Sequence, residues 1–333
     1  MDTKTLLSHI ELELQKQIAR LDQPRMKGFH EMLTYHMGWT GEGAGAEATG
    51  KRIRPLLVLL CTASCSASWQ LALPAAAAIE LVHNFSLVHD DIQDNSPKRR
   101  GRDTVWVKWG APMAINAGDA LFVLSNQAII DLKDNYPAEV VVRAAEILHN
   151  TCLDLTRGQY LDISYEERKD LSVEDYWPMI SGKTSALLMA CCQIGALLGG
   201  ADEEKQAAYR SFGHFLGLAF QVQDDILGIW GDEKATGKSA ASDLVEGKNS
   251  LPVLAGLRKK GKFAERWAQG PIKPEEVEEL ARVLASEDGY GFAKEASIQM
   301  TDMAINGLRE ADPQGEAGEA LFELTNRLLN REQ

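Results

Sequence analysis

Residues 215–229 read FLGLAFQVQDDILGI, and this stretch decides the fold class. Its apolar side chains recur every three or four positions, at Phe215, Ala219, Val222, Ile226 and Ile229. That spacing is the period of an α-helix with one buried face. The rest of the chain shows the same period, and no segment alternates with the period of a β-strand. We therefore predict an all-α fold.

Further apolar stripes extend this prediction along the chain. One runs through Leu81, Phe85, Val88 and Ile92, and amphipathic stretches are expected near both ends. Short punctuations separate the helices, and no linker or shift in composition marks a second domain. The sequence therefore predicts one large helical bundle, a single domain over residues 1–333.

The charge balance of the chain excludes one class of function. Its 333 residues carry a formal net charge of -13, whereas a nucleic-acid binder usually presents a basic face. An acidic protein also repels anionic substrates as a whole. Any such substrate must therefore bind through local basic clusters or bound cations.

The cysteines and the apolar runs bear on the compartment. Five cysteines in a chain of this length do not suggest a disulfide framework, and no second Cys or His pair has the spacing of a zinc site. We expect a reducing, cytoplasmic location. The first residues do not read as a signal peptide, and the uncharged run at residues 184–201 reads as a buried helix rather than a membrane span.

Two acidic turns carry the chemistry. In HDDIQD, Asp90 and Asp94 are four residues apart, so they share one face of a helix. Like charges in that arrangement weaken an isolated helix by a few tenths of a kcal/mol, roughly, unless a cation lies between them. The alternative is a solvated acidic face. A second pair, Asp224 and Asp225, lies within the strongest apolar stripe, which favours a shared metal cluster.

Two segments resemble phosphate-binding loops of nucleotidases, and both depart from that pattern. Residues 45–51 end in Gly-Lys, but Arg52 stands where a Ser or Thr should bind Mg²⁺. Residues 237–239 read GKS, with Asp232 in place of the first glycine. Neither segment follows a predicted strand, which argues against a P-loop enzyme.

Taken together, these motifs resemble those of the trans-polyprenyl (farnesyl and geranylgeranyl) diphosphate synthases. Residues 87–101, LVHDDIQDNSPKRRG, resemble the first Asp-rich motif of that family, and residues 220–228, FQVQDDILG, resemble the second. GKRIRP at residues 50–55 resembles the isopentenyl-diphosphate motif. The resemblance implies a helical bundle of the isoprenoid synthase type around a central active-site cavity, Mg²⁺ as the cofactor, and a homodimer.

The resemblance also implies a role for each matching residue. Asp90 and Asp94 would hold two Mg²⁺ ions and Asp224 a third, with Asp91, Asp225, Gln159 and Asp162 in support. Isopentenyl diphosphate would bind Lys51, Arg54, His83 and Arg100. The allylic diphosphate would bind Arg99, Lys183, Lys238 and Lys248. Thr184 and Gln221 would present oxygens to the developing carbocation.

One position departs from the family pattern. Gly228 stands where the second motif commonly has a third Asp, so a carboxylate is missing there. A glycine in a helix also costs about 1 kcal/mol relative to alanine. We therefore expect the third metal to depend on Asp224 and water. The loop at residues 231–249, with its glycines and lysines, is expected to close over bound diphosphate.

The implied reaction joins an allylic diphosphate (dimethylallyl, geranyl or farnesyl) to isopentenyl diphosphate by ionisation, condensation and elimination. Phe85, five residues before Asp90, resembles the residue that ends chain growth in geranylgeranyl diphosphate (C20) synthases. Alternatives are a farnesyl diphosphate (C15) or longer-chain synthase, a non-catalytic subunit of a heteromeric synthase, and a class I terpene cyclase. A cyclase would not need GKRIRP.

Overall fold

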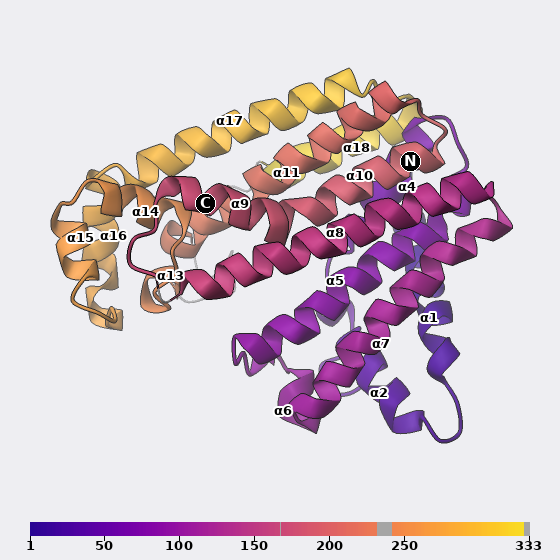
Figure 1. The fold of residues 1–333 in the computed structure, drawn as a ribbon, viewed down its shortest axis with the longest axis horizontal. Coiled ribbons are helices and arrows are strands. Elements are labelled where there is room, and N and C mark those ends of the chain that lie inside the picture. Colours follow the sequence, from indigo (N-terminus) through magenta and orange to yellow (C-terminus); the bar gives the residue numbers. More distant parts are fainter. Residues whose placement is uncertain (167, 232–241, 330–333) are drawn as a thin grey trace. The chain divides into compact units, whose positions relative to one another are not determined.

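The structure, a computed structural model, is built almost entirely from helices, as predicted (Figure 1). It describes residues 1–166, 168–231 and 242–329. The chain divides into two compact units. Unit 1 comprises residues 1–150, 190–206 and 313–321, and unit 2 comprises residues 151–189, 207–312 and 322–333. The prediction of a single domain stays a prediction.

The first 150 residues hold short elements around two long helices. The elements are α1 (Thr3–Ile18), η1 (Ala19–Leu21), α2 (Lys27–His36), α3 (Ala46–Thr49), α4 (Ile53–Ser64), η2 (Trp69–Ala72), α5 (Leu73–Gln93), β1 (Lys98–Arg99), β2 (Arg102–Asp103), α6 (Val105–Trp109), α7 (Ala111–Ile130), η3 (Asp131–Asp134) and the start of α8 (Ala138–Tyr165). The later helices α10 (Ala186–Leu198), α11 (Glu203–Trp230) and α18 (Gly315–Leu329) each begin or end in unit 1.

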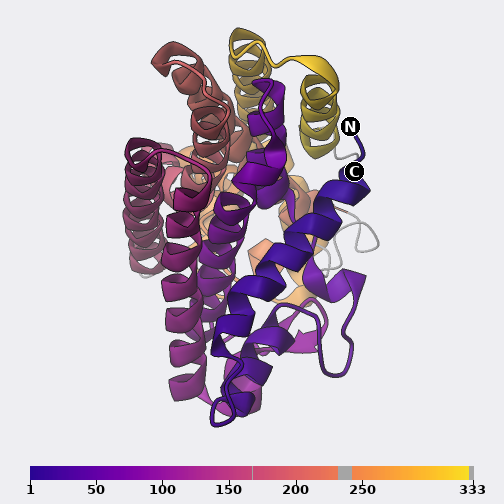
Figure 2. The ribbon, with the colours of Figure 1, turned by 90° about the vertical axis from the view of Figure 1, so that its right-hand side faces the viewer.

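Helix α5 is the centre of unit 1. It contacts α7, α4 and α1, and α1 is the indigo helix in Figure 2. The run of small side chains at residues 75–78 is fully buried, which lets neighbouring helices approach closely. Gly118 of α7 serves the same purpose, because a Cβ there would lie 2.3 Å from the His89 ring.

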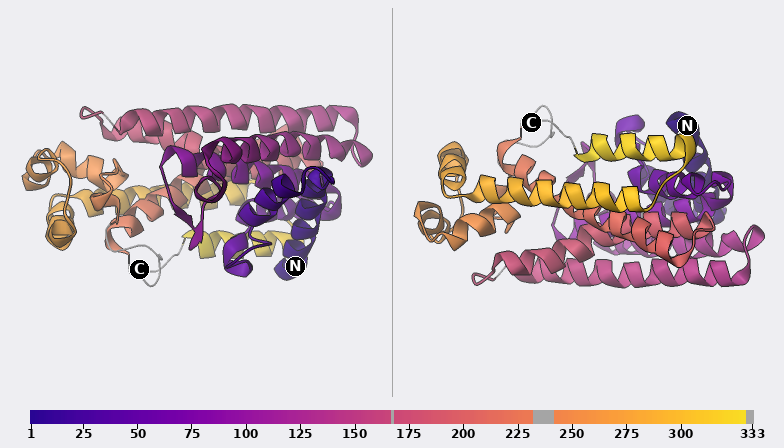
Figure 3. Two further views of the ribbon diagram at one scale, coloured as in Figure 1. Left: turned by 90° about the horizontal axis from the view of Figure 1, so that it is seen from below. Right: turned by 90° about the horizontal axis from the view of Figure 1, so that it is seen from above.

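Unit 2 contains the remaining elements. They are α9 (Val173–Ile180), a π-helical turn η4 (Ser181–Ser185), α13 (Ser242–Val245), α14 (Leu251–Arg258), α15 (Lys262–Trp267), η5 (Pro274–Glu276), α16 (Val277–Ser286) and α17 (Gly289–Glu310). Helices α14 and α16 pack against α17, which Figure 3 shows along its length. The predicted stripe of α11 is confirmed, since Val222, Ile226 and Ile229 lie in the hydrophobic core of this unit.

The terminal stripes and the apolar helices behave as the periodicity predicts. Leu6, Ile10, Leu14 and Ile18 are all buried. Among the described residues, three helical stretches are long and apolar enough to cross a membrane by length and composition: Trp69–Gln93, Ala111–Asp134 and Val173–Leu198. Within their apolar windows, 67%, 44% and 61% is buried inside the protein, so much of this apolar surface serves packing.

A small β-hairpin in unit 1 is an element that the sequence did not predict. Strand β1 pairs antiparallel with β2, with Lys98 opposite Asp103 and Arg99 opposite Arg102. The two residues between them, Arg100 and Gly101, have φ values of 52° and 75°, as the type I′ turn of a two-residue hairpin requires. The strands are too short for a period of two to be visible in the sequence.

In unit 2, the close approach of α8 to η4 depends on two glycines. A Cβ at Gly158 would lie 2.1 Å from the backbone nitrogen of Lys183 and 2.5 Å from the carbonyl carbon of Gly182. We predict that Gly158→Ala lowers the free energy of unfolding by about 1–3 kcal/mol, because backbone atoms cannot rotate away from the added methyl group. Urea unfolding followed by circular dichroism measures this change.

The control for this variant is Gly28→Ala, on α2. Nothing lies within 4 Å of a Cβ at Gly28, and the helix favours alanine by about 1 kcal/mol at most. Equal unfolding free energies for the wild type and Gly158→Ala would contradict the steric argument.

Candidate active site

The first Asp-rich turn lies at the carboxyl end of α5. The Asp90 carbonyl accepts a hydrogen bond from the Asp94 backbone N–H at 2.8 Å, so the two residues occupy one helical turn as predicted. Asp90 is half-buried and Asp94 is exposed. Asp91 points elsewhere, because adjacent helical residues are about 100° apart around the axis.

Asp91 is buried and held by the hairpin. Its Oδ1 accepts a hydrogen bond from Nε of Arg99 at 2.8 Å and forms an ion pair with Nη2 at 2.8 Å. Burial raises the pKa of Asp91 to about 6, although Arg99 opposes that shift. Arg99, predicted to bind the allylic diphosphate, is thus engaged with Asp91 in this structure.

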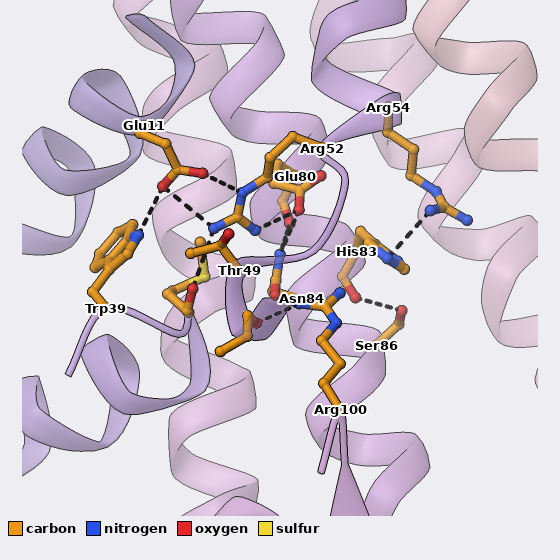
Figure 4. A network of polar contacts seen from close by, with 12 residues as sticks. Glu11, Trp39, Thr49, Arg52, Arg54, Glu80, His83, Asn84, Ser86 and Arg100 are labelled. Carbon is orange, nitrogen blue, oxygen red and sulfur yellow. Dashed lines mark hydrogen bonds and ion pairs between the residues drawn. The ribbon is translucent and has the colours of Figure 1, made fainter. Parts of the chain in front are cut away.

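Four residues predicted to bind isopentenyl diphosphate belong to one region of unit 1. Lys51 is exposed beside Gly50, whose φ is 77°. Nη1 of Arg54 lies 3.2 Å from Nε2 of His83, and Nη1 of Arg100 donates to the Ala48 carbonyl at 2.8 Å (Figure 4). A Cβ on Gly50 would lie 2.5 Å from the Arg100 guanidinium, so that side chain would have to shift to accommodate one.

His83 is neutral in this setting. Burial, together with the charges of Arg54, Arg100 and Arg99, holds its pKa well below the ordinary value. A guanidinium can only donate hydrogen bonds, so Nε2 accepts and the ring proton lies on Nδ1. The region thus concentrates positive charge in an acidic protein, which suits a diphosphate.

Arg52, inside the GKRIRP motif, is a residue whose role the sequence did not reveal. It is 4% exposed and adopts a left-handed backbone conformation with φ 47° and ψ 38°. Such a conformation costs about 1–3 kcal/mol for a residue other than glycine. Arg52 donates to Glu11 at 2.6 Å and to Glu80 at 2.8 Å (Figure 4). Burial would lower the pKa of Arg52, but the two carboxylates outweigh burial and raise it.

The second Asp-rich turn lies in α11, and its two acids also differ in burial. Asp224 is half-buried, whereas Asp225 is buried. Asp225 accepts hydrogen bonds from the Tyr176 hydroxyl at 2.7 Å, from the Leu251 backbone N–H at 3.0 Å and from Nε2 of Gln221 at 2.9 Å. Burial raises the pKa of Asp225 to about 6, although these donors oppose the shift. Tyr176 is a supporting residue that the motifs did not reveal.

Gln221 links Asp225 to Thr184. Its amide nitrogen faces the Asp225 carboxylate, so its Oε1 faces Thr184 and accepts the hydroxyl hydrogen bond at 2.8 Å. The network therefore determines the orientation of the Gln221 amide. Lys183, one residue before Thr184, forms an ion pair with Asp162 of α8, and the supporting role of Asp162 stays a prediction.

The structure explains how the chain accommodates Gly228. A Cβ at this position would lie 2.3 Å from Oδ2 of Asp243, so the Asp243 carboxylate occupies the space of the missing side chain. Asp243 is buried, and its Oδ1 lies 3.3 Å from Nζ of Lys248. Burial would lower the pKa of Lys248, but Asp243 and Glu246 raise it well above its ordinary value.

The predicted loop at residues 231–249 is described only in part. Residues 232–241, which include Lys234 and Lys238, lie outside the described residues, so the expected closure of the loop stays a prediction.

The acidic turns offer the donors that Mg²⁺ prefers. Asp90 and Asp94 supply carboxylate oxygens from one helical turn, and Mg²⁺ is usually held by one or two carboxylates and by substrate phosphates. Within the described ranges, no three His, Cys, Asp or Glu side chains form a ready-made metal site. The carboxylates of Asp90 and Asp94 fit an ion that binds together with a diphosphate.

Comparison with known proteins identifies the family. A model of the polyprenyl synthetase family matches residues 44–285. The chain belongs to this family. It is a prenyl diphosphate synthase, an enzyme class that generally uses Mg²⁺.

Individual relatives agree with this assignment. Over 315 residues the chain is 38% identical to a geranylgeranyl diphosphate synthase of Mycobacterium tuberculosis, covering 92% of this chain and 89% of that protein. It is 39% identical over 257 residues to a (2E,6E)-farnesyl diphosphate synthase of Mycobacterium bovis, covering 77% and 69%. A crystal structure of polyprenyl synthetase from Streptomyces coelicolor superposes with a TM-score of 0.87 at 35% identity, covering 98% and 99%.

Substitutions of the two acids in the second turn are predicted to have different effects, one on stability and the other on activity. Asp225→Ala removes the acceptor of three hydrogen bonds and leaves buried donors on Tyr176 and Leu251 without that acceptor. We predict a loss of about 1–3 kcal/mol in the free energy of unfolding, measured in urea without Mg²⁺. Asp224→Ala should lower kcat by orders of magnitude with little change in stability, and Asp90→Ala should behave in the same way. Equal destabilisation by the two neighbouring substitutions would contradict this division.

Proposed function

We propose that the chain condenses isopentenyl diphosphate with allylic diphosphates and that its main product is geranylgeranyl diphosphate (C20). This proposal rests on a basic cluster in a chain of net charge -13, made of Lys51, Arg54, His83 and Arg100. A terpene cyclase takes up no isopentenyl diphosphate and has no use for the cluster. The relatives above include both geranylgeranyl and farnesyl diphosphate synthases, so farnesyl diphosphate and longer products are the alternatives.

In the proposed site, Asp90 and Asp94 hold two Mg²⁺ ions and Asp224 a third. Bound Mg²⁺ stabilises the negative charge of the departing pyrophosphate. Lys183 and Lys248 bind and orient the allylic diphosphate, as do Arg99 and Lys238.

The remaining groups act on the hydrocarbon part of the reaction. Thr184 donates its hydroxyl proton to Gln221, so its oxygen presents lone pairs. These lone pairs, together with the Gln221 oxygen, stabilise positive charge at C1 of the allylic substrate. The isopentenyl double bond attacks that carbon, and the released pyrophosphate removes the proton. We assign no protein general base.

We further propose a cytoplasmic homodimer. In α7, the side chains of Met113, Ile115, Val123 and Ile130 are 46–55% exposed, which is unusual for so many large apolar groups on one helix. A second copy of the chain would cover them.

The first test of the function uses the purified chain alone. It is incubated with labelled isopentenyl diphosphate and each allylic starter, and the products are sized. We predict turnover to C20 in the presence of Mg²⁺, no turnover in excess chelator, and recovery when Mg²⁺ is restored. Turnover that requires a second protein would instead indicate a subunit of a heteromeric synthase, and cyclised products would indicate a cyclase.

Product length is assigned from Phe85 of α5. This side chain is half-buried, and its ring lies 5.0 Å from that of Phe122 on α7 and 5.1 Å from that of His89. An aromatic pair supported by two helices would form a firm floor for the growing chain. Each added isoprene unit gains roughly 3–4 kcal/mol of burial, at about 0.8 kcal/mol per carbon, so a steric stop is needed to end growth.

We predict that Phe85→Ala opens this floor and yields products longer than those of the wild type. Product chain lengths are measured by reversed-phase chromatography after dephosphorylation. Phe292→Ala is the matched control, because it removes a half-buried ring on α17 that packs under Arg258. An active Phe85→Ala enzyme with unchanged product length would exclude Phe85 as the stop.

A further inference from the structure

Helix α1 lies outside the region that the family model matches, yet it contacts the isopentenyl-diphosphate motif. The family model begins at residue 44, whereas Glu11 lies on α1. Glu11 binds Arg52, the residue between Lys51 and Arg54 in GKRIRP. We propose that Arg52 is a positioning residue, held by Glu11 and Glu80, that presents Lys51 and Arg54 to isopentenyl diphosphate. This inference rests on the proposed function.

The donors of Arg52 are directed into the protein. Nε donates to Oε1 of Glu11 at 2.6 Å, and Nη1 donates to Oε1 of Glu80 at 2.8 Å. Nη2 donates to the Met37 carbonyl at 3.3 Å and lies 3.4 Å from Oε2 of Glu11. With each of its three nitrogens used in this way and the side chain buried, Arg52 acts on a substrate only through its neighbours (Figure 4).

The backbone of Arg52 explains how it acts. Its left-handed conformation turns the chain sharply between the exposed Lys51 and the first turn of α4, which contains Arg54. An arginine has no intrinsic preference for this conformation. The bonds of its side chain to α1, α5 and the end of α2 retain it. If they are weakened, the turn relaxes and both flanking cations move.

Helix α5 ties the same network to His83, the uncharged member of the cluster. Nδ2 of Asn84 donates to Oε1 of Glu80 at 3.0 Å and to the Glu80 carbonyl at 2.7 Å, which orients the carboxylate toward Arg52. His83, the residue before Asn84, contacts Arg54. One helix therefore contacts both Arg52 and Arg54.

The test uses Glu11→Gln, with Glu13→Gln as the matched control on the same helix. Glu13 accepts hydrogen bonds from Lys16 and Gln17, none of the contacts described for it involves Arg52, and the substitution is chemically identical. We expect Glu11→Gln to raise the KM for isopentenyl diphosphate about tenfold, while kcat and the KM for the allylic substrate stay within about twofold. Glu13→Gln should leave all three constants unchanged.

A second readout measures binding without turnover. Isopentenyl diphosphate alone has no allylic partner, so calorimetry with this ligand gives its Kd directly. The Kd should rise about tenfold in Glu11→Gln, in parallel with the KM. If Glu11→Gln lowers the melting temperature while leaving the Kd unchanged, or raises both KM values equally, Arg52 and its partners have only a structural role and the inference is overturned.

Two substitutions of Arg52 separate the effect of its side chain from the effect of its backbone conformation. Arg52→Gly accepts the left-handed conformation without strain, whereas Arg52→Ala does not. If the guanidinium network positions the motif, both variants weaken isopentenyl diphosphate binding, and free guanidinium ion partly restores Arg52→Gly. Wild-type affinity in Arg52→Gly would refute the role of the side chain. If neither variant folds, Glu11→Gln decides.

The outcomes also separate this inference from the proposed function. A wild-type enzyme that does not consume isopentenyl diphosphate overturns the proposed function itself. A wild-type enzyme that does consume it, combined with an unchanged Glu11→Gln variant, overturns only the role assigned to Arg52.

Discussion

The buried guanidinium of Arg52 is the constraint on which the arrangement of the first unit depends. One cation is enclosed by carboxylates from α1 and α5 and by a carbonyl at the end of α2. A buried ion pair contributes little net stability, since desolvation offsets much of the attraction, but an unpaired member is strongly unfavourable. The pairing therefore specifies geometry. Through one cation, it ties α1 and α5 to the turn that precedes α4.

That geometry resolves the conflict between an acidic protein and an anionic substrate. The net charge of -13 acts over long distances and is screened by salt, whereas a diphosphate at contact distance senses the side chains beside it. Lys51, Arg54 and Arg100 supply positive charge in the region of Gly50, and the neutral His83 adds an imidazole without adding repulsion. The buried Asp91 is neutralised by its ion pair with Arg99. The charges of nearby side chains thus affect a bound diphosphate more than the net charge of the chain does.

Sequence reasoning succeeded where short-range periodicity carries the information. The all-α class, the stripe of α11 and the shared turn of Asp90 and Asp94 follow from helical spacing, and the structure confirms each of them. The partners of Arg52 lie 41 and 28 residues away, and Tyr176 lies 49 residues from Asp225. No local pattern encodes such contacts. Position 228 shows the same limit, because the sequence reveals a missing carboxylate there and not the Asp243 side chain that fills its space.

In both Asp-rich turns the two acids differ in burial in the same way, and helix geometry explains why. Adjacent helical residues point about 100° apart, so the two acids of a pair cannot face the same ligand equally. In each turn the second acid is buried and hydrogen-bonded, Asp91 to Arg99 and Asp225 to Tyr176, while the first stays more accessible. The buried acid anchors its helix to a neighbouring element, the hairpin in one case and α9 in the other. The first acid is thereby held in place on the other side of its turn, and the two acids of a pair do not compete for the same position.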